Sequence, residues 1–243
     1  MDNSLLIHLA ETSSTSECLK RHGLPHGLCV WADFQTAGRG QGSNRWESSP
    51  GENLLFSLLL HPAKITPDRQ FVLTEIVTTA MHRVLQPLIS TEISVKWPND
   101  IYAGNGKLCG ILIENTLLGN RWENAVIGIG LNVNQTIFRS DAPNPVSLRS
   151  IAGREFSRDA LLVSLVNSIL ETYESYDDSS RSALHSSYMS RLYRRDGFFP
   201  YETADGERFT ARIDSIDDMG LLTLVTPDGL RRTFMFKEVR HIL

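Results

Sequence analysis

Short apolar runs separated by polar turn sequences dominate the first half of the chain. Leu5, Ile7 and Leu9 recur at every second position, whereas residues 28–34, 54–60 and 126–133 are almost continuously apolar. Alternation is typical of a short strand, and continuous apolar runs of this length predict buried strands. The first half of the chain is therefore expected to form a sheet.

A hairpin is predicted near the middle of the chain. A strand that begins at residue 93 runs into Trp97-Pro98 and resumes after Asn99-Asp100. The sequence Gly104-Asn105-Gly106 then favours a tight turn, which returns the chain through residues 107–115.

Helices are predicted on both sides of these strands. Residues 67–89 carry a broad apolar face, and Pro67 suits the first turn of a helix. Ser157 is a suitable N-cap for a helix through about Ser175, and a second, shorter helix ends near Arg194.

The pattern changes after residue 196. Residues 200–243 contain only short β-type runs with turn residues at regular intervals, which favours a small barrel or sandwich. The sequence thus predicts a mixed α/β domain with flanking helices over residues 1–195 and a small β domain over residues 196–243.

Composition narrows the functional classes. The 243 residues are 41% hydrophobic and 21% charged, as in ordinary globular proteins, and the formal net charge of −4 argues against a general nucleic-acid binder. Three cysteines without a Cys-x-x-Cys spacing imply neither a disulfide framework nor a zinc knuckle. The short apolar run at the start is neither a signal peptide nor a membrane span, so a cytoplasmic protein is expected.

A stretch rich in glycine and arginine, residues 35–46, is the first candidate site. Gly38, Gly40 and Gly42 are interspersed with Arg39, and Arg45 follows. Alternating glycines expose backbone N–H groups that can surround an anion, and arginine recognises carboxylate or phosphate. A mobile surface loop with solvated arginines is an equally good interpretation of this stretch alone.

Neither common nucleotide motif is present. A dinucleotide-binding motif requires a third glycine where Ser43 stands. A Walker-type phosphate loop requires Ser or Thr after Gly-Lys, but Gly106-Lys107 is followed by Leu108.

A hydroxyl cluster precedes a short predicted helix that ends before Gly23. Residues 12–16 are all Ser or Thr, although one hydroxyl suffices to cap a helix. The remaining hydroxyls could bind a polar ligand at the helix N-terminus, and capping alone is the alternative.

Three further positions have unusual chemistry. Lys107 lies in a strand-forming segment, where an ammonium group requires an anionic partner unless it is a solvated edge lysine. Asp100 could lie near a divalent cation or could cap its own turn. Gly128 and Gly130 within a predicted strand indicate close approach of a ligand or another backbone.

In order along the chain, these segments resemble those of the biotin–protein ligases. The resemblance rests on Ser14-Thr15-Ser16, Gln35 to Gly40, Trp46, Lys96-Trp97-Pro98-Asn99-Asp100-Ile101-Tyr102, residues 107–114 beginning Lys107-Leu108-Cys109-Gly110, and Gly128-Ile129-Gly130-Leu131-Asn132-Val133-Asn134. It extends over nearly the whole chain, and Lys-Trp-Pro-Asn-Asp followed by Lys-Leu-x-Gly-Ile-Leu is highly specific. It implies an SH3-like barrel for the small domain and a short form without the N-terminal DNA-binding domain of some relatives.

The resemblance implies a two-step reaction. Biotin and Mg-ATP would form biotinyl-5′-AMP and pyrophosphate, and a lysine of a biotin carboxyl carrier protein domain, usually of acetyl-CoA carboxylase, would then accept the biotin. Biotin would be bound by Ser14, Thr15, Ser16, Gln35, Gly38, Arg39, Gly40, Gln41, Lys107 and Gly110, with Lys107 and Arg39 as the catalytic cations. The nucleotide would be bound by Trp46, Asn99, Asp100, Asn132 and Arg240, with Asp100 near Mg²⁺.

The chain also departs from the family pattern. Many members have further arginines where this sequence has Gln41, Gly42 and Asn44. We therefore expect faster escape of the adenylate, with Arg45 as the residue that could compensate.

Rival interpretations follow from the same fold. A lipoate–protein ligase would carry an Arg-Arg run leading to Ser-Gly-Gly-Gly, which the sequence lacks. A DNA-binding repressor is disfavoured because the hydroxyl cluster begins at Thr12, which leaves no room for a three-helix DNA reader. A biotin-binding module without transfer activity remains an alternative. The protein is expected to be a monomer or a homodimer, with strand 126–133 as a possible pairing edge.

Overall fold

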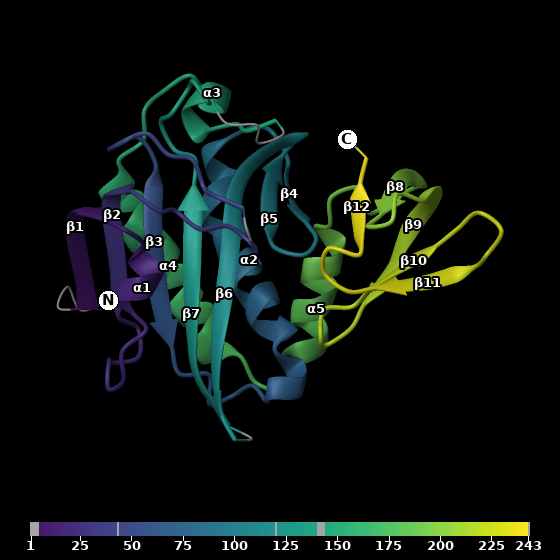
Figure 1. The fold of residues 1–243 in the computed structure, drawn as a ribbon, viewed down its shortest axis with the longest axis horizontal. Coiled ribbons are helices and arrows are strands. Elements are labelled where there is room, and N and C mark those ends of the chain that lie inside the picture. The colour runs from purple at the N-terminus through teal and green to yellow at the C-terminus, as the bar shows by residue number, and fades with distance from the viewer. Residues whose placement is uncertain (1–4, 43, 120, 140–143, 243) are drawn as a thin grey trace.

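A seven-stranded mixed sheet is the centre of the fold (Figure 1). The computed structural model describes residues 5–42, 44–119, 121–139 and 144–242. The strand order is β1-β2-β3-β7-β6-β5-β4, with β1 and β2 parallel and all other neighbours antiparallel. The strands are β1 (Leu6–Thr12), β2 (Cys29–Gln35), β3 (Leu54–Leu60), β4 (Ile93–Lys96), β5 (Asp100–Ala103), β6 (Gly106–Leu118) and β7 (Arg121–Leu131).

The apolar runs form the strands that the sequence predicts. Every residue of β3 is buried, and β3 pairs with β2 on one side and β7 on the other. The hairpin between β5 and β6 turns at Gly104 and Asn105, as expected.

Two long helices pack against each other and cover one face of this sheet (Figure 1). They are α2 (Phe71–Leu85) and α4 (Arg158–Ser175), and the Ser157 hydroxyl accepts the Ala160 N–H as the predicted cap of α4. The prediction of one continuous helix over residues 67–89 is wrong at both ends, where 3₁₀ turns lie at Pro67–Arg69 and Gln86–Leu88. Proline lacks the N–H that an α-helix interior needs, which accounts for the break at Pro87.

The remaining helices are short. They are α1 (Thr15–Cys18), α3 (Leu148–Ala152) and α5 (Arg181–Ser190). The helix predicted after the hydroxyl cluster is therefore a single turn.

A second, five-stranded antiparallel sheet follows α5, which confirms a small β unit at the C-terminus. Its order is β11-β10-β9-β8-β12, with β8 (Phe199–Thr203), β9 (Arg208–Ile216), β10 (Leu222–Val225), β11 (Arg231–Phe234) and β12 (Val239–His241). The side chains of Phe71, Trp97 and Tyr188 pack with the apolar face of this C-terminal sheet in one buried cluster. The Trp97 indole also donates a hydrogen bond of 3.0 Å to the Gly220 carbonyl.

Sheet order corrects two interpretations. Strand β7 lies between β3 and β6, so it has no free edge for pairing across a dimer. Lys107 lies on β6 where β5 pairs with it, so it is not an edge lysine. Sequence order alone does not tell which strands are central, because periodicity reports the faces of a strand and not its neighbours.

Candidate active site

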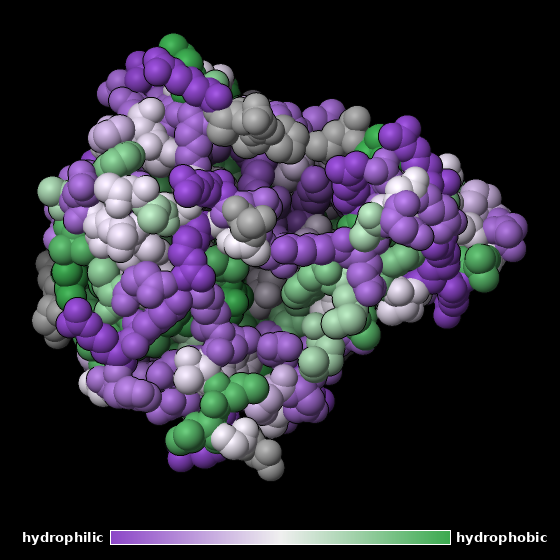
Figure 2. All heavy atoms as spheres, viewed as in Figure 1, coloured by the Kyte–Doolittle hydropathy of each residue, from purple (hydrophilic) through white to green (hydrophobic). Residues whose placement is uncertain are grey.

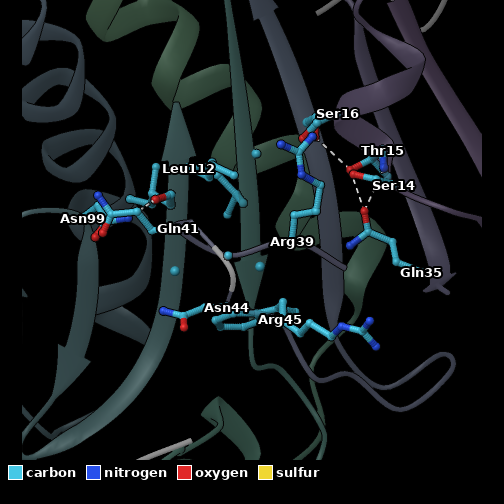
Figure 3. A pocket seen from close by; sticks show the side chains of 18 of the residues that line it. Ser14, Thr15, Ser16, Gln35, Arg39, Gln41, Asn44, Arg45, Asn99 and Leu112 are labelled. Carbon is cyan, nitrogen blue, oxygen red and sulfur yellow. Dashed lines mark hydrogen bonds between the residues drawn. The ribbon is translucent and has the colours of Figure 1, made fainter. Parts of the chain in front are cut away.

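A cavity of about 140 Å³ lies over β6 and β7, beneath the Gly/Arg loop of residues 36–46 (Figure 3). Figure 2 shows a largely hydrophilic hollow on this face, between the two sheets. The predicted site residues that line the cavity are Ser14, Thr15, Ser16, Gln35, Arg39, Gly40, Gln41, Trp46, Asn99, Asp100, Lys107 and Gly110. Gly38, Asn132 and Arg240 are not among its lining residues.

One end of the cavity is a network of hydroxyl and amide groups. The backbone N–H and hydroxyl of Thr15 donate to Gln35 Oε1 at 2.8 and 3.1 Å. The Ser57 hydroxyl lies 2.8 Å from the Thr15 hydroxyl and 3.0 Å from the Ser16 hydroxyl. Ser14 is at the N-cap of α1 but makes no side-chain capping bond, so capping alone does not explain the cluster.

Ser57 is a cavity residue that the sequence pattern did not single out. It is fully buried and lines the cavity. The available signal was a single hydroxyl within the apolar run of β3, and such a residue is usually a satisfied core serine.

Glycines in the two central strands make room for side chains from α1 and the loop. A Cβ at Gly128 would lie 2.9 Å from the Ser16 hydroxyl, and one at Gly110 would lie 2.8 Å from Trp46 Cζ3. A Cβ at Gly130 would overlap the Trp46 indole. The Trp46 ring therefore lies directly on β6 and β7.

The opposite end of the cavity carries opposite charges. Lys107 Nζ lies 2.7 Å from Asp100 Oδ1, and both side chains are about three-quarters buried. The Asn99 side-chain amide donates to the Ile111 carbonyl at this end (Figure 3). Asp100 thus fixes the position of Lys107, and an anion that enters the cavity would compete with Asp100 for the ammonium group.

Asn132 binds the backbone of Lys107. Its side-chain amide donates to the backbone carbonyls of Lys107 at 3.3 Å and Val146 at 3.1 Å, and it is buried. The structure therefore places Asn132 at the backbone of β6, outside the lining of the cavity. That it faces the nucleotide stays a prediction.

The Gly/Arg loop folds as a narrow hairpin over the cavity. Gly40 N–H donates to the Asn44 carbonyl at 2.8 Å, and Trp46 N–H donates to the Gly38 carbonyl at 3.1 Å. Gly38 is needed for this hairpin, because a Cβ there would lie 2.8 Å from the Trp46 carbonyl oxygen.

Arg39 is held by carboxylates of the protein. Its guanidinium donates to Glu17 of α1 and, at 3.0 Å, to Glu114 of β6. Lys20 binds the same two carboxylates at 2.7 and 3.0 Å. We refer to Glu17, Lys20, Arg39 and Glu114 as the Arg39 cluster. It is separate from the Lys107–Asp100 pair.

A second cavity of about 170 Å³ adjoins the first and shares Gln41, Asn99 and Asp100 with it. Arg240 lines this second cavity from β12 and binds Glu202 at 2.5 Å. Lys96 lines it as well, and burial lowers the pKa of its ammonium group.

Two of the cysteines, Cys29 and Cys109, are buried thiols. Burial raises the pKa of Cys29 to about 12, and it also raises the pKa of Cys109, so both thiols stay protonated. No group of three or more His, Cys, Asp or Glu side chains suitable for a metal lies among the described residues. No helix in those ranges has the length and hydropathy to cross a membrane.

A mixed seven-stranded sheet followed by a small antiparallel sheet is the architecture of solved biotin protein ligases. The biotin protein ligase of Aquifex aeolicus in complex with biotin and ATP superposes with a TM-score of 0.81 and 25% identity, over 98% of this chain and 99% of that one. The fold is therefore that of the biotin protein ligase class.

The chain belongs to the biotin/lipoate A/B protein ligase family, whose model matches residues 9–132. It is 30% identical over 241 residues to the bifunctional ligase/repressor BirA of Bacillus subtilis, covering 96% of this chain and 73% of that protein. It is 28% identical to the biotin–[acetyl-CoA-carboxylase] ligase of Paracoccus denitrificans, covering 91% and 94% of the two chains.

Proposed function

We propose that this protein is a biotin–protein ligase that forms biotinyl-5′-AMP from biotin and ATP and transfers the biotinyl group to a lysine of a carrier protein. The observation that carries the proposal is the arrangement of one cavity with a hydroxyl and amide end, a lysine that is about three-quarters buried at the other end, and a second cationic cavity beyond it. The Aquifex complex and the name of the Paracoccus ligase support the same ligands.

The hydroxyl end suits the ureido group of biotin. A ureido group has two N–H donors and one carbonyl acceptor, and Thr15, Ser16 and Ser57 carry hydroxyls that can donate or accept. The dithiolane ring of lipoate lacks these polar groups. The buried hydroxyl network therefore favours biotin over lipoate, because unmatched buried polar groups are costly.

Lys107 would bring the two anionic substrates together. Its ammonium group can bridge the biotin carboxylate and the α-phosphate and offset their repulsion. A carboxylate oxygen then attacks the α-phosphorus, the bond to the bridging oxygen breaks, and pyrophosphate leaves. In the second step the acceptor amine attacks the acyl carbon, the bond to AMP breaks, and the amine loses a proton.

Asp100 is the carboxylate that would face Mg²⁺. Magnesium in nucleotide sites typically takes one or two carboxylates together with substrate phosphates and water, so a single Asp100 beside two connected cavities fits. Bound Mg²⁺ would neutralise phosphate charge. Lys107, released from Asp100, would then be available to the reacting carboxylate.

The loop residues would shield the activated intermediate. The cavity is covered by Arg39, Gly40 and Gln41. Gly38 accepts a hydrogen bond from Trp46 in the loop hairpin, and the Trp46 ring lines one side of the cavity. An acyl adenylate is hydrolysed by water, so a cover that excludes water is useful.

The acceptor would be a biotin carboxyl carrier protein domain of acetyl-CoA carboxylase or a related carboxylase, as the name of the Paracoccus ligase suggests. We expect the reaction in the cytoplasm, without nucleic acid, by a monomer or a homodimer.

Biotin-dependent pyrophosphate release and labelled-biotin transfer to a carrier domain test the proposal. We expect both activities only with Mg-ATP. Lys107→Ala should abolish adenylate formation while leaving the fold intact, as checked by circular dichroism, whereas Lys64→Gln, at an exposed lysine outside both cavities, should behave like the unaltered protein. Absence of biotin-dependent pyrophosphate release from the unaltered protein would refute the function, and normal release from Lys107→Ala would remove Lys107 from the mechanism.

A further inference from the structure

Lys237, in the connection between β11 and β12, has a backbone conformation that lysine rarely adopts. Its φ is 72°, in the left-handed region that favours glycine. A residue other than glycine keeps this backbone conformation where its surroundings or its function require it. The structure shows a specific contact that this side chain makes.

The Lys237 ammonium group meets the Gly/Arg loop at Gly42. Gly42 also has a positive φ, of 67°, and a Cβ placed on it would overlap Lys237 Nζ. The lysine therefore occupies space that any larger residue at position 42 would fill. Lys237 forms no ion pair within the described part of the chain.

Lys237 lines the second cavity together with Lys96 and Arg240. The acidic side chain in this lining is Asp100, which is already bound to Lys107 at 2.7 Å. Arg240 is paired with Glu202, so the lining cations that form no ion pair among the described residues are Lys96 and Lys237. The cavity shares a wall with the cavity that contains Lys107. Its chemistry fits a polyanion that extends from the reacting centre.

The loop itself provides little of this charge. Gln41, the loop residue in this lining, is neutral, and so is Gly42, which Lys237 contacts. We infer that Lys237 binds the β- and γ-phosphates of ATP, and the pyrophosphate formed from them, so that the C-terminal sheet supplies a cation that the loop lacks. This inference rests on the proposed ligase function.

The experiment compares Lys237→Gln with the unaltered protein in biotin-dependent pyrophosphate release. A charge-assisted hydrogen bond to phosphate is lost, so the KM for ATP should rise about tenfold or more, while the KM for biotin stays the same. Lys237→Arg should retain most of the affinity for ATP. Lys64→Gln is the matched control, since it removes an exposed lysine outside both cavities.

A second measurement separates phosphate binding from support of the loop. Biotinyl-5′-AMP lacks the β- and γ-phosphates, so its dissociation rate from Lys237→Gln should equal that from the unaltered protein. The double variant Lys237→Gly with Gly42→Arg moves the cation, and with it the side chain at a positive φ, from residue 237 to the loop, and it should restore the KM for ATP.

Two outcomes would overturn the inference. One is an unchanged KM for ATP in Lys237→Gln. The other is a dissociation rate of biotinyl-5′-AMP that rises by the same factor as the KM for ATP, which would indicate a structural contact with the loop. An unaltered protein without any biotin-dependent activity would instead refute the ligase function itself, so the two failures are distinguishable.

Discussion

The Arg39 cluster should hold the Gly/Arg loop closed in the absence of ligand. Glu17 and Glu114 come from α1 and β6, and both bind the Arg39 guanidinium. Replacing both carboxylates, in Glu17→Gln with Glu114→Gln, removes the anions from the cluster without changing the size of either side chain.

The expected magnitude follows from exposure. The Arg39 side chain is 43% exposed, and Glu17 and Glu114 are 47% and 25% exposed. Ion pairs at this exposure contribute about 0.2–1 kcal/mol each. Loss of two pairs should therefore favour loop opening by about 1 kcal/mol, which is roughly fivefold in the opening equilibrium.

Hydrogen exchange of the peptide that spans residues 36–46 measures this opening. Exchange in the double variant should be about fivefold faster at low ionic strength. In the unaltered protein it should accelerate as salt rises to about 1 M, where the screening length falls to about 3 Å. Glu123→Gln, on β7 outside the cluster, is the control.

The pH dependence has a defined sign. The hydrogen bond from Lys20 lowers the pKa of Glu17 below its ordinary value of 4.5, and Arg39 contributes to the same shift. The contribution of Glu17 to loop closure is therefore complete above pH 4.5 and is lost as the pH falls through the lowered pKa.

One result would refute this account of the loop. If exchange of residues 36–46 were the same in both proteins and independent of salt, closure would have to come from the backbone hairpin and Trp46, not from the Arg39 cluster.

Two further predictions concern buried positions. Glu75 is fully buried and binds Arg181 and His185 at 2.7 Å each, so Glu75→Ala should cost about 3–5 kcal/mol of stability and lower the melting temperature by about 6–20 °C. Calorimetry checks this, with Glu171→Ala, at an exposed position on α4, as the control. Equal melting temperatures for the two variants would contradict the prediction. Gly130→Ala should displace the Trp46 indole and weaken biotin binding by about tenfold, which is within the range of overpacking costs, while the circular dichroism spectrum stays unchanged. Calorimetric titration with biotin measures the affinity. Full affinity would show that the ring moves at no cost.

The strands and the cavity segments were predictable because their signals are local. Apolar runs define β2, β3 and β7, and Ser157 is a cap by virtue of its own neighbours. The loop of residues 36–46 attracted attention through its glycines, whose backbone freedom has no use in a packed core.

Partners that come from distant segments were not predictable. Arg39 binds Glu17 and Glu114, which are 22 and 75 residues away in the sequence, and no periodic pattern connects them. Asn132 follows β7 directly, but only the pairing of β7 with β6 shows that its amide binds the backbone of Lys107. Lys237 carried no local signal at all, because its significance depends on contact with Gly42.

The buried cluster around Phe71, Trp97 and Tyr188 has a consequence for how the chain loses its structure. A chain truncated after residue 195 would leave these rings facing water, and it would free the segment that carries Asn99 and Asp100. Heating the whole chain should accordingly give a single cooperative melting event, with vitamin activation and the C-terminal strands lost at the same temperature.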